Sequence, residues 1–70
     1  MSDEKARAIG KRIRRLRKDR GWTQADLAAK TGLQTNTIAR LERGKNRPAD
    51  PSLEQLAKAF GVTASEILRY

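Results

Sequence analysis

The chain has 70 residues, enough for one domain, and carries 16 Lys and Arg against 8 Asp and Glu, a net charge of +8. A domain of this size buries only about 60% of its unfolded surface, which disfavours a large catalytic cleft. The sequence has no Cys and no His, which excludes disulfides, thiolate metal sites and the commonest general base. The basic balance favours a nucleic-acid partner, although acidic proteins and anionic membranes would suit it too.

The sequence contains no long apolar segment. No apolar run approaches the ~18 residues of a membrane span, and the first residues lack the apolar stretch of a secretory signal. We therefore expect a soluble, cytoplasmic protein, prokaryotic or phage-encoded, that forms a single domain over residues 1–70. We expect no enzyme: the chain offers no catalytic pair, no metal site, no cofactor motif and no evident small-molecule substrate.

Helical periodicity dominates the chain, and no strand-like alternation lasts four residues. The first helix is predicted from about Asp3 to Arg20, and Gly21 follows where helices commonly end in a left-handed turn. Its apolar residues recur at helical spacing. They are Ala6, Ile9, Ile13 and Leu16.

The second helix begins with strong entry signals. Thr23 suits the N-cap, Asp26 lies in the first turn, and Trp22 and Leu27 have the spacing of a hydrophobic staple. This spacing assigns Trp22 to the core rather than to stacking on a base. Gly32 ends the helix.

The third helix is predicted from about Thr35 to Glu42. Ile38 and Leu41 are its inward pair, and Gly44 closes it. Residues 45–51 follow as a loop with Pro, Asn and Asp turn chemistry.

Two more helices complete the chain. Asp50 or Ser52 is expected to cap the fourth, which ends at Gly61, while Thr63 and Glu66 form a capping box at the start of the fifth. The apolar residues of the two helices are Leu53, Leu56, Ala57 and Phe60 in the fourth, and Val62, Ile67 and Leu68 in the fifth.

The pattern thus predicts an all-α fold of five short helices. The connection between the second and third helices spans only about residues 32–34 and begins with Gly. A turn this short between two helices is typical of a helix-turn-helix.

Residues 24–41 resemble the helix-turn-helix of phage repressors and Cro proteins, the XRE family. Gln24 opens the first motif helix, Ala28 lies at the close helix–helix contact, Gly32 is in the turn, and Ile38 and Leu41 face inward. The flanks match as well, in the segments Ile9-Gly10-Lys11-Arg12-Ile13-Arg14, Leu16-Arg17, Leu41-Glu42-Arg43-Gly44, Leu53-Glu54-Gln55-Leu56-Ala57 and Phe60-Gly61-Val62. The resemblance implies a lambda-repressor-like DNA-binding domain over nearly the whole chain.

One departure concerns the start of the third helix. Gln34 stands where the family usually has a Ser or Thr N-cap. We therefore expect this helix to start one residue late, with Thr35 as its cap.

The third helix carries a candidate base-reading face. At about 100° per residue, Asn36, Arg40 and Arg43 lie opposite Ile38 and Leu41. Arg can donate two hydrogen bonds to guanine, Asn can pair with adenine, and Thr offers a hydroxyl and a methyl group. The resemblance implies the same placement, with base contacts from Gln34, Thr35, Asn36 and Arg40.

Other residues are candidates for phosphate contacts. Gln24 lies at a helix N-terminus, where backbone N–H groups attract phosphate. Arg43 lies at the exit of the third helix, and a short basic loop follows it. The predicted phosphate set is Gln24, Arg43, Lys45, Asn46, Arg47 and, on the first helix, Arg12.

Arg17 differs from the other basic residues of the first helix. It falls on the apolar face beside Ile13 and Leu16, so its charge must either extend to water or find a partner. The resemblance implies an ion pair with Glu42 that fixes the reading helix.

The leading hypothesis is sequence-specific binding of double-stranded DNA by a transcription regulator, most simply a repressor, that forms a weak homodimer on DNA. The alternative is a protein-interaction module of the same fold, such as a coactivator bridging protein or an antitoxin. Binding of RNA or an anionic membrane through the first helix is less favoured, because the core takes up its apolar stripe.

Overall fold

The computed structural model of the chain describes residues 3–69 and contains no strand among them. Its helices are α1 (Glu4–Asp19), α2 (Gln24–Thr31), α3 (Thr35–Glu42), α4 (Asp50–Phe60) and α5 (Ala64–Leu68). The predicted all-α fold of five short helices is confirmed, with helix ends within one or two residues of those expected.

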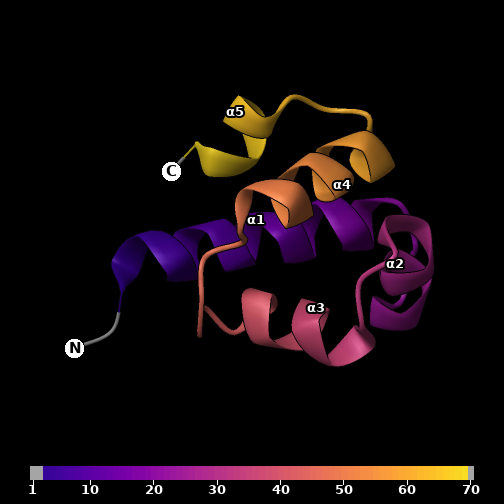
Figure 1. Cartoon of the computed structure of the whole chain (residues 1–70), viewed down its shortest axis with the longest axis horizontal. Coiled ribbons are helices and arrows are strands. Elements are labelled where there is room, and N and C mark those ends of the chain that lie inside the picture. The colour runs from indigo at the N-terminus through magenta and orange to yellow at the C-terminus, as the bar shows by residue number, and fades with distance from the viewer. Residues whose placement is uncertain (1–2, 70) are drawn as a thin grey trace.

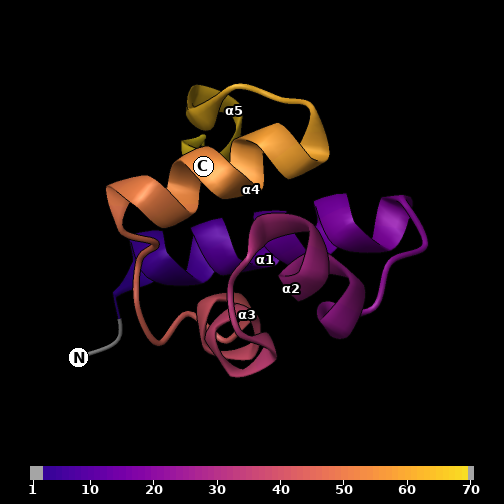
Figure 2. The same ribbon diagram turned by 45° about the vertical axis from the view of Figure 1, so that its right-hand side comes forward.

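The helices pack around α1, which runs through the middle of the domain (Figure 1). α1 packs against α3 on one side and α5 on the other, while α2 bridges α3 and α4. Figure 2 shows α3 end-on at the edge of the bundle, away from α4 and α5. None of the described helices is long and apolar enough to cross a membrane.

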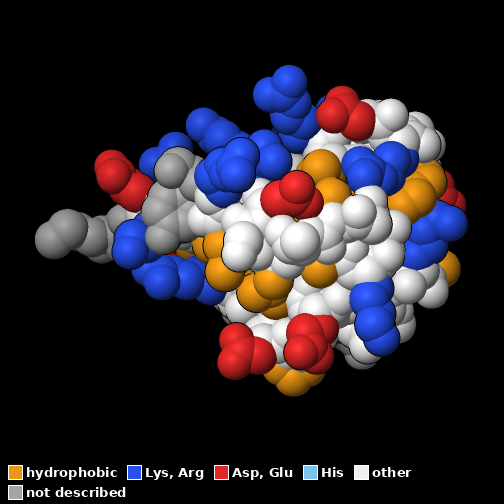
Figure 3. All heavy atoms as spheres, turned by 90° about the horizontal axis from the view of Figure 1, so that it is seen from above, with side chains coloured by type: hydrophobic (Ala, Val, Ile, Leu, Met, Phe, Trp, Pro, Cys, Tyr) orange, Lys and Arg blue, Asp and Glu red, His pale blue; other side chains and the backbone are white. Residues whose placement is uncertain are grey.

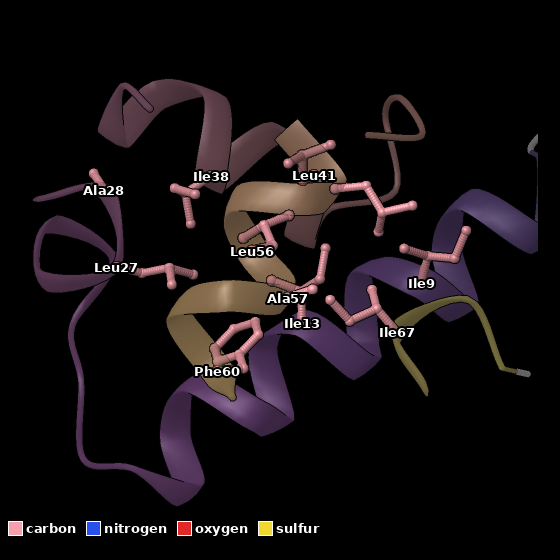
Figure 4. Close-up of a cluster of buried hydrophobic side chains, with 11 residues drawn as sticks. Ile9, Ile13, Leu27, Ala28, Ile38, Leu41, Leu56, Ala57, Phe60 and Ile67 are labelled. Atoms are coloured by element: carbon pink, nitrogen blue, oxygen red, sulfur yellow. The ribbon is translucent and has the colours of Figure 1, made fainter. Parts of the chain in front are cut away.

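Every helix contributes one large, fully buried side chain to a shared core (Figure 4). These side chains are Ile13, Leu27, Ile38, Leu56 and Ile67. Burial of such a side chain stabilises a fold by about 1.5–3 kcal/mol. Each helix is therefore held mainly by tertiary packing, as expected for helices this short.

Two of the helices begin with capping boxes. In α2 the N–H of Asp26 donates to Thr23 Oγ1 (3.0 Å) and the N–H of Thr23 donates to the Asp26 carboxylate (2.8 Å). In α5 the same exchange joins Thr63 and Glu66 at 3.2 and 2.9 Å, as predicted. These reciprocal bonds satisfy backbone donors that the helices leave unpaired.

Two predicted caps are wrong. α3 begins at Thr35 with Gln34 as N-cap, so Thr35 is the first helical residue and does not cap. α4 begins at Asp50 with Ala49 as N-cap, so neither Asp50 nor Ser52 caps it. A Pro in the first turn of α4 favours this earlier start, because its fixed φ suits a helix and it has no N–H to satisfy.

Trp22 packs in the core, as predicted, but its main partner comes from α4. Its ring stacks on Phe60 with centroids 5.9 Å apart and 11° between the planes. Arg20 lies over both rings and donates to the carbonyl oxygens of Leu16 (2.8 Å) and Phe60 (2.6 Å). This cluster ties the end of α1 to the end of α4.

Gly10 sets the distance between α1 and α3. A Cβ atom at this position would lie 2.3 Å from the carbonyl oxygen of Leu41 and 2.9 Å from that of Glu42. Both neighbours are backbone atoms of α3, so no side-chain rearrangement could relieve the clash. Only glycine allows the two helices to approach this closely.

Candidate nucleic-acid interface

The outer face of α3 is polar and exposed. Ile38 and Leu41 are buried beneath it, while Thr35, Asn36 and Arg40 are exposed. Gln34, at the N-cap, is exposed too and makes no side-chain capping bond. The four predicted base-reading residues are thus all exposed, Gln34, Thr35 and Asn36 at the start of α3 and Arg40 in its last turn.

The turn after α3 returns the chain toward this face. Gly44 adopts a left-handed φ of +74°, and its N–H donates to the carbonyl of Leu41 (3.0 Å), while the N–H of Lys45 donates to that of Arg40 (3.1 Å). This pair of bonds is a Schellman motif, which ends a helix sharply. Arg40 Nη2 then donates to Asn46 Oδ1 across 3.4 Å, so the loop and the helix face meet.

A bidentate ion pair lies beneath α3. Arg17 Nε and Nη2 donate to the two carboxylate oxygens of Glu42 at 2.6 and 2.9 Å, and the side chains are only 9% and 4% exposed. Arg17 Nη1 also donates to the carbonyl of Trp22 at 2.8 Å. The carboxylate raises the pKa of Arg17 above its usual value, so the guanidinium stays charged. The ion pair implied by the resemblance is present.

Gln24 belongs to the same network. Its amide Nε2 donates to Glu42 Oε1 at 3.2 Å, so Glu42, the last residue of α3, is bonded both to the end of α1 and to the start of α2. One amide hydrogen of Gln24 is therefore used inside the protein. Sequence reasoning assigned this side chain to phosphate alone and missed its bond to Glu42.

Two more of the predicted phosphate residues, both arginines, have partners inside the protein. Arg12 Nε donates to the carbonyl of Glu66 at 2.9 Å. α5 lies across α1 from α3 (Figure 1), so Arg12 is on the wrong side for the α3 face and instead anchors α5. Arg47 forms a bidentate pair with the Asp3 carboxylate at 2.8 and 3.2 Å.

Arg43 and Lys45 remain as exposed cations at the exit of α3. Within residues 3–69 neither side chain makes an ion pair or a side-chain hydrogen bond, and Arg43 is the C-cap of the helix. Of the predicted phosphate residues, these two therefore keep all their side-chain donors unengaged within the described residues.

A structural role that sequence reasoning missed belongs to Thr31, in the turn between α2 and α3. Its buried hydroxyl donates to the carbonyl oxygens of Leu27 and Ala28, and its oxygen accepts from the N–H of Leu33 at 3.3 Å. The hydroxyl thus holds the turn together from within. A Thr directly before the glycine that ends a helix was the available signal.

Comparison with known proteins agrees with the helix-turn-helix geometry described above. A family model described as Helix-turn-helix matches residues 13–67, most of the chain. The chain belongs to the XRE-type helix-turn-helix family of DNA-binding transcription regulators.

Similar proteins include repressors from bacteria and phage. The chain is 42% identical over 59 residues to a competence pilus inhibition repressor of Acinetobacter baylyi, covering 84% of this chain and 54% of that protein. It is 38% identical over 60 residues to the immunity repressor of Bacillus phage phi105, covering 86% of this chain and 42% of that protein. The chain therefore spans about half the length of these two relatives.

Solved structures show the same fold. The restriction-modification controller protein C.AhdI from Aeromonas hydrophila superposes with a TM-score of 0.89 at 28% identity, covering 93% of this chain and 98% of that one. The clp gene regulator ClgR from Corynebacterium glutamicum has a TM-score of 0.86 at 25% identity, covering 97% of this chain and 72% of that one.

Removing one partner of the buried pair should destabilise the domain. Arg17→Met leaves the Glu42 carboxylate buried without its counter-charge, at a cost of about 3 kcal/mol in the free energy of unfolding. Arg14→Met, at an exposed position of the same helix, is the control and should leave the midpoint nearly unchanged. Chemical denaturation of the two variants measures the difference; equal losses would show that the ion pair does not stabilise the fold.

The Asp3–Arg47 pair makes a prediction about titration. Hydrogen bonds from Arg47, and then from backbone N–H groups, lower the pKa of Asp3 below its usual 3.8. A depressed pKa means that the carboxylate stabilises the fold above its usual pKa and loses this effect as the pH falls through the lowered one. NMR titration of Asp3 should give a pKa that rises in Arg47→Gln. An identical pKa in both proteins would mean that the pair does not form in solution.

Proposed function

We propose that the chain binds double-stranded DNA with α3 in the major groove and acts as a transcription regulator, most simply as a repressor. One observation carries the proposal: an exposed helix face with Gln34, Thr35, Asn36 and Arg40, held from beneath by the Arg17–Glu42 pair. A helix of this size fits the major groove, where each base pair presents a distinct set of donors and acceptors.

Each side chain of the face suits a particular kind of base contact. Arg40 can donate two hydrogen bonds to O6 and N7 of guanine, and Asn36 can pair with N6 and N7 of adenine. Thr35 offers its hydroxyl and a methyl group to thymine. Asn46 accepts from Arg40 in the free protein, so it can hold the guanidinium near the groove until a base replaces it.

Phosphate contacts would come from both sides of α3. Arg43 and Lys45 provide free charge at its exit, and Gln24 lies at the start of α2 with one amide hydrogen still available. In Arg47, binding of a phosphate has to compete with Asp3. Such contacts position a protein on DNA without reading sequence.

The proposal includes a weak homodimer that forms on DNA. A single reading helix covers only a few base pairs, and two half-sites one helical turn apart supply the missing specificity. Leu68 of α5 is the large apolar side chain that remains exposed among the described residues, at 40%. The exposed part of α5 and the loop before α4 are therefore the proposed contact.

Sites selected from random duplex DNA should converge on one motif with two half-sites, and this motif supplies the operator for the sharper test. Arg40→Ala should weaken operator binding by about 1–3 kcal/mol per half-site and relax the preference at one base pair, a G·C. Measured affinities for a set of single-base operator variants report both effects.

Arg43→Ala and Lys45→Ala are the matched controls. Phosphate contacts carry no base preference, so each control should weaken all operator variants alike and reduce the salt slope by about one unit. A uniform loss in Arg40→Ala would make Arg40 a phosphate contact and overturn the assigned reading face. Failure to enrich any motif would favour the protein-interaction module.

A further inference from the structure

The exposed side of α1 carries a line of basic residues that neither the core nor the α3 face uses. Arg7, Lys11, Arg14 and Lys18 follow one another at intervals of four, three and four residues, which places them on one side of a helix. All four are exposed. We call them the α1 stripe. Figure 3 shows Lys and Arg side chains gathered over the N-terminal part of the molecule, along α1.

The fold gains nothing from this charge. The basic residues of α1 with structural roles are others: Arg12 binds α5, Arg17 binds Glu42, and Arg20 binds the Trp22–Phe60 cluster. Within residues 3–69 no side chain of the stripe makes an ion pair or a side-chain hydrogen bond.

Like charges one turn apart destabilise an isolated helix by about 0.2–0.5 kcal/mol per pair. The stripe contains three such neighbouring pairs. Glu4 and Asp19 are the acidic residues at the two ends of α1. Within the described residues neither forms an ion pair with a residue of the stripe. The arrangement therefore costs stability and has no partner in the domain itself.

The stripe lies beside the α3 face rather than behind it. At about 100° per residue, its mean direction is roughly 70° around α1 from Gly10, which touches the backbone of α3. At its N-terminal end, Arg7 lies against Gly44, the residue that ends the turn after α3. A duplex bound at α3 would therefore lie next to the stripe, and the DNA that continues past α3 would approach it.

The chemistry of the stripe fits phosphate better than a membrane. It spans eleven residue steps, about 16 Å along the helix axis, which is about half a turn of duplex DNA. Among the described residues the large exposed apolar side chain is Leu68, which lies on α5 and not on α1, and the apolar side chains of α1 are buried in the core or packed against it. An interfacial helix needs such an apolar face for insertion, whereas phosphate binding needs only the charge.

The geometry points to a second contact: the α1 stripe binds the phosphate backbone of DNA that flanks the segment read by α3, on the same duplex. This inference rests on the proposed function and extends it. The contact would depend on the length of the duplex and not on its sequence. It would also give a use to the charge on the first helix that the reading face leaves unexplained.

The test compares two operator duplexes, one ending at the outermost base pairs of the selected motif and one extended by about 10 base pairs on each side. The wild type should show a steeper salt dependence on the long duplex. The slope of log affinity against log salt concentration should be larger in magnitude by about 0.9 for each added phosphate contact. Arg14→Gln combined with Lys18→Gln should remove about 1.8 of this difference for each bound subunit. Over a fourfold change in salt, that is about a twelvefold change in the ratio of the two affinities for each subunit.

The matched control is Lys58→Gln combined with Arg69→Gln, which also removes one Lys and one Arg. Lys58 is exposed on α4, and Arg69 is exposed just after α5. It lowers the net charge equally, so it should retain the full advantage of the long duplex. If both double variants lose that advantage equally, the stripe contributes only to the long-range field and the inference is overturned. Equal salt slopes of the wild type on the two duplexes would overturn it as well.

Two further arms separate this inference from its alternatives. A duplex of the same length with a scrambled motif tests the proposed function: equal affinity for the two sequences defeats sequence reading, while the effect of length on affinity still reports on the stripe. Vesicles of anionic lipid test whether the stripe binds a membrane surface instead of DNA. Vesicle binding that depends on Arg14 and Lys18, without any effect of duplex length, would overturn the inference in favour of a lipid surface.

Discussion

The close contact between α1 and α3 determines the position of the exposed α3 face that we propose as the reading face. At Gly10 the backbones of the two helices meet with no side chain between them, and about two turns further along α1 Arg17 binds the carboxylate of Glu42. The first contact sets the separation of the helices, and the second fixes the end of α3 in rotation. The outer residues of α3 therefore receive their orientation from α1 rather than from anything on α3 itself.

A buried ion pair is a costly way to hold a helix, since well-packed apolar residues often stabilise a fold as much. Here Glu42 also accepts from Gln24, and Arg17 also donates to the carbonyl of Trp22. Hydrogen bonds need defined directions, whereas apolar contacts tolerate sliding. In a domain with so small a core, the network supplies a fixed geometry among α1, α2 and α3 that packing alone would leave looser.

The strong positive charge of the chain divides into groups with separate uses. Arg12, Arg17 and Arg20 bind the protein's own backbone or an acidic partner, and they hold α5, α3 and α4 against α1. Arg47 is paired at the surface with Asp3. The exposed cations with no ion pair among the described residues include Arg43 and Lys45 at the exit of α3 and the α1 stripe. The net charge of the sequence does not distinguish these groups, because the role of each arginine depends on the helix that its guanidinium contacts.

Much of the fold could be predicted from the sequence, because apolar spacing and glycine positions depend on local physics. Ile38 and Leu41 gave the inward side of α3, and Thr63 with Glu66 gave the start of α5. The wrong predictions concern features that need the third dimension. The expected caps at Thr35 and at Asp50 or Ser52 followed residue preferences, but packing and a proline decided the starts of those helices.

The same distinction applies to the candidate site. Side-chain chemistry was enough to propose Arg40 and Asn36 as base-reading residues, and the structure shows both of them exposed on α3. The bond from Arg12 to a carbonyl oxygen of α5, 54 residues further along the chain, was not predicted. The stacking of Trp22 on Phe60 and the bond from Gln24 to Glu42 also join distant segments, and no local pattern indicates them.

Gly10→Ala tests most directly whether the α1–α3 contact positions the proposed reading face. The added Cβ must push α3 away from α1, at a cost of about 1–3 kcal/mol in the free energy of unfolding. Gly61→Ala is the matched comparison: its φ of +71° makes alanine strained, but nothing lies within 4 Å of the new atom and the site is in the α4–α5 connection. Operator affinity is measured under conditions in which both variants are folded. We predict that operator affinity falls by at least about tenfold in Gly10→Ala and is unchanged in Gly61→Ala. Wild-type affinity in folded Gly10→Ala would show that the α1–α3 contact does not position the proposed reading face.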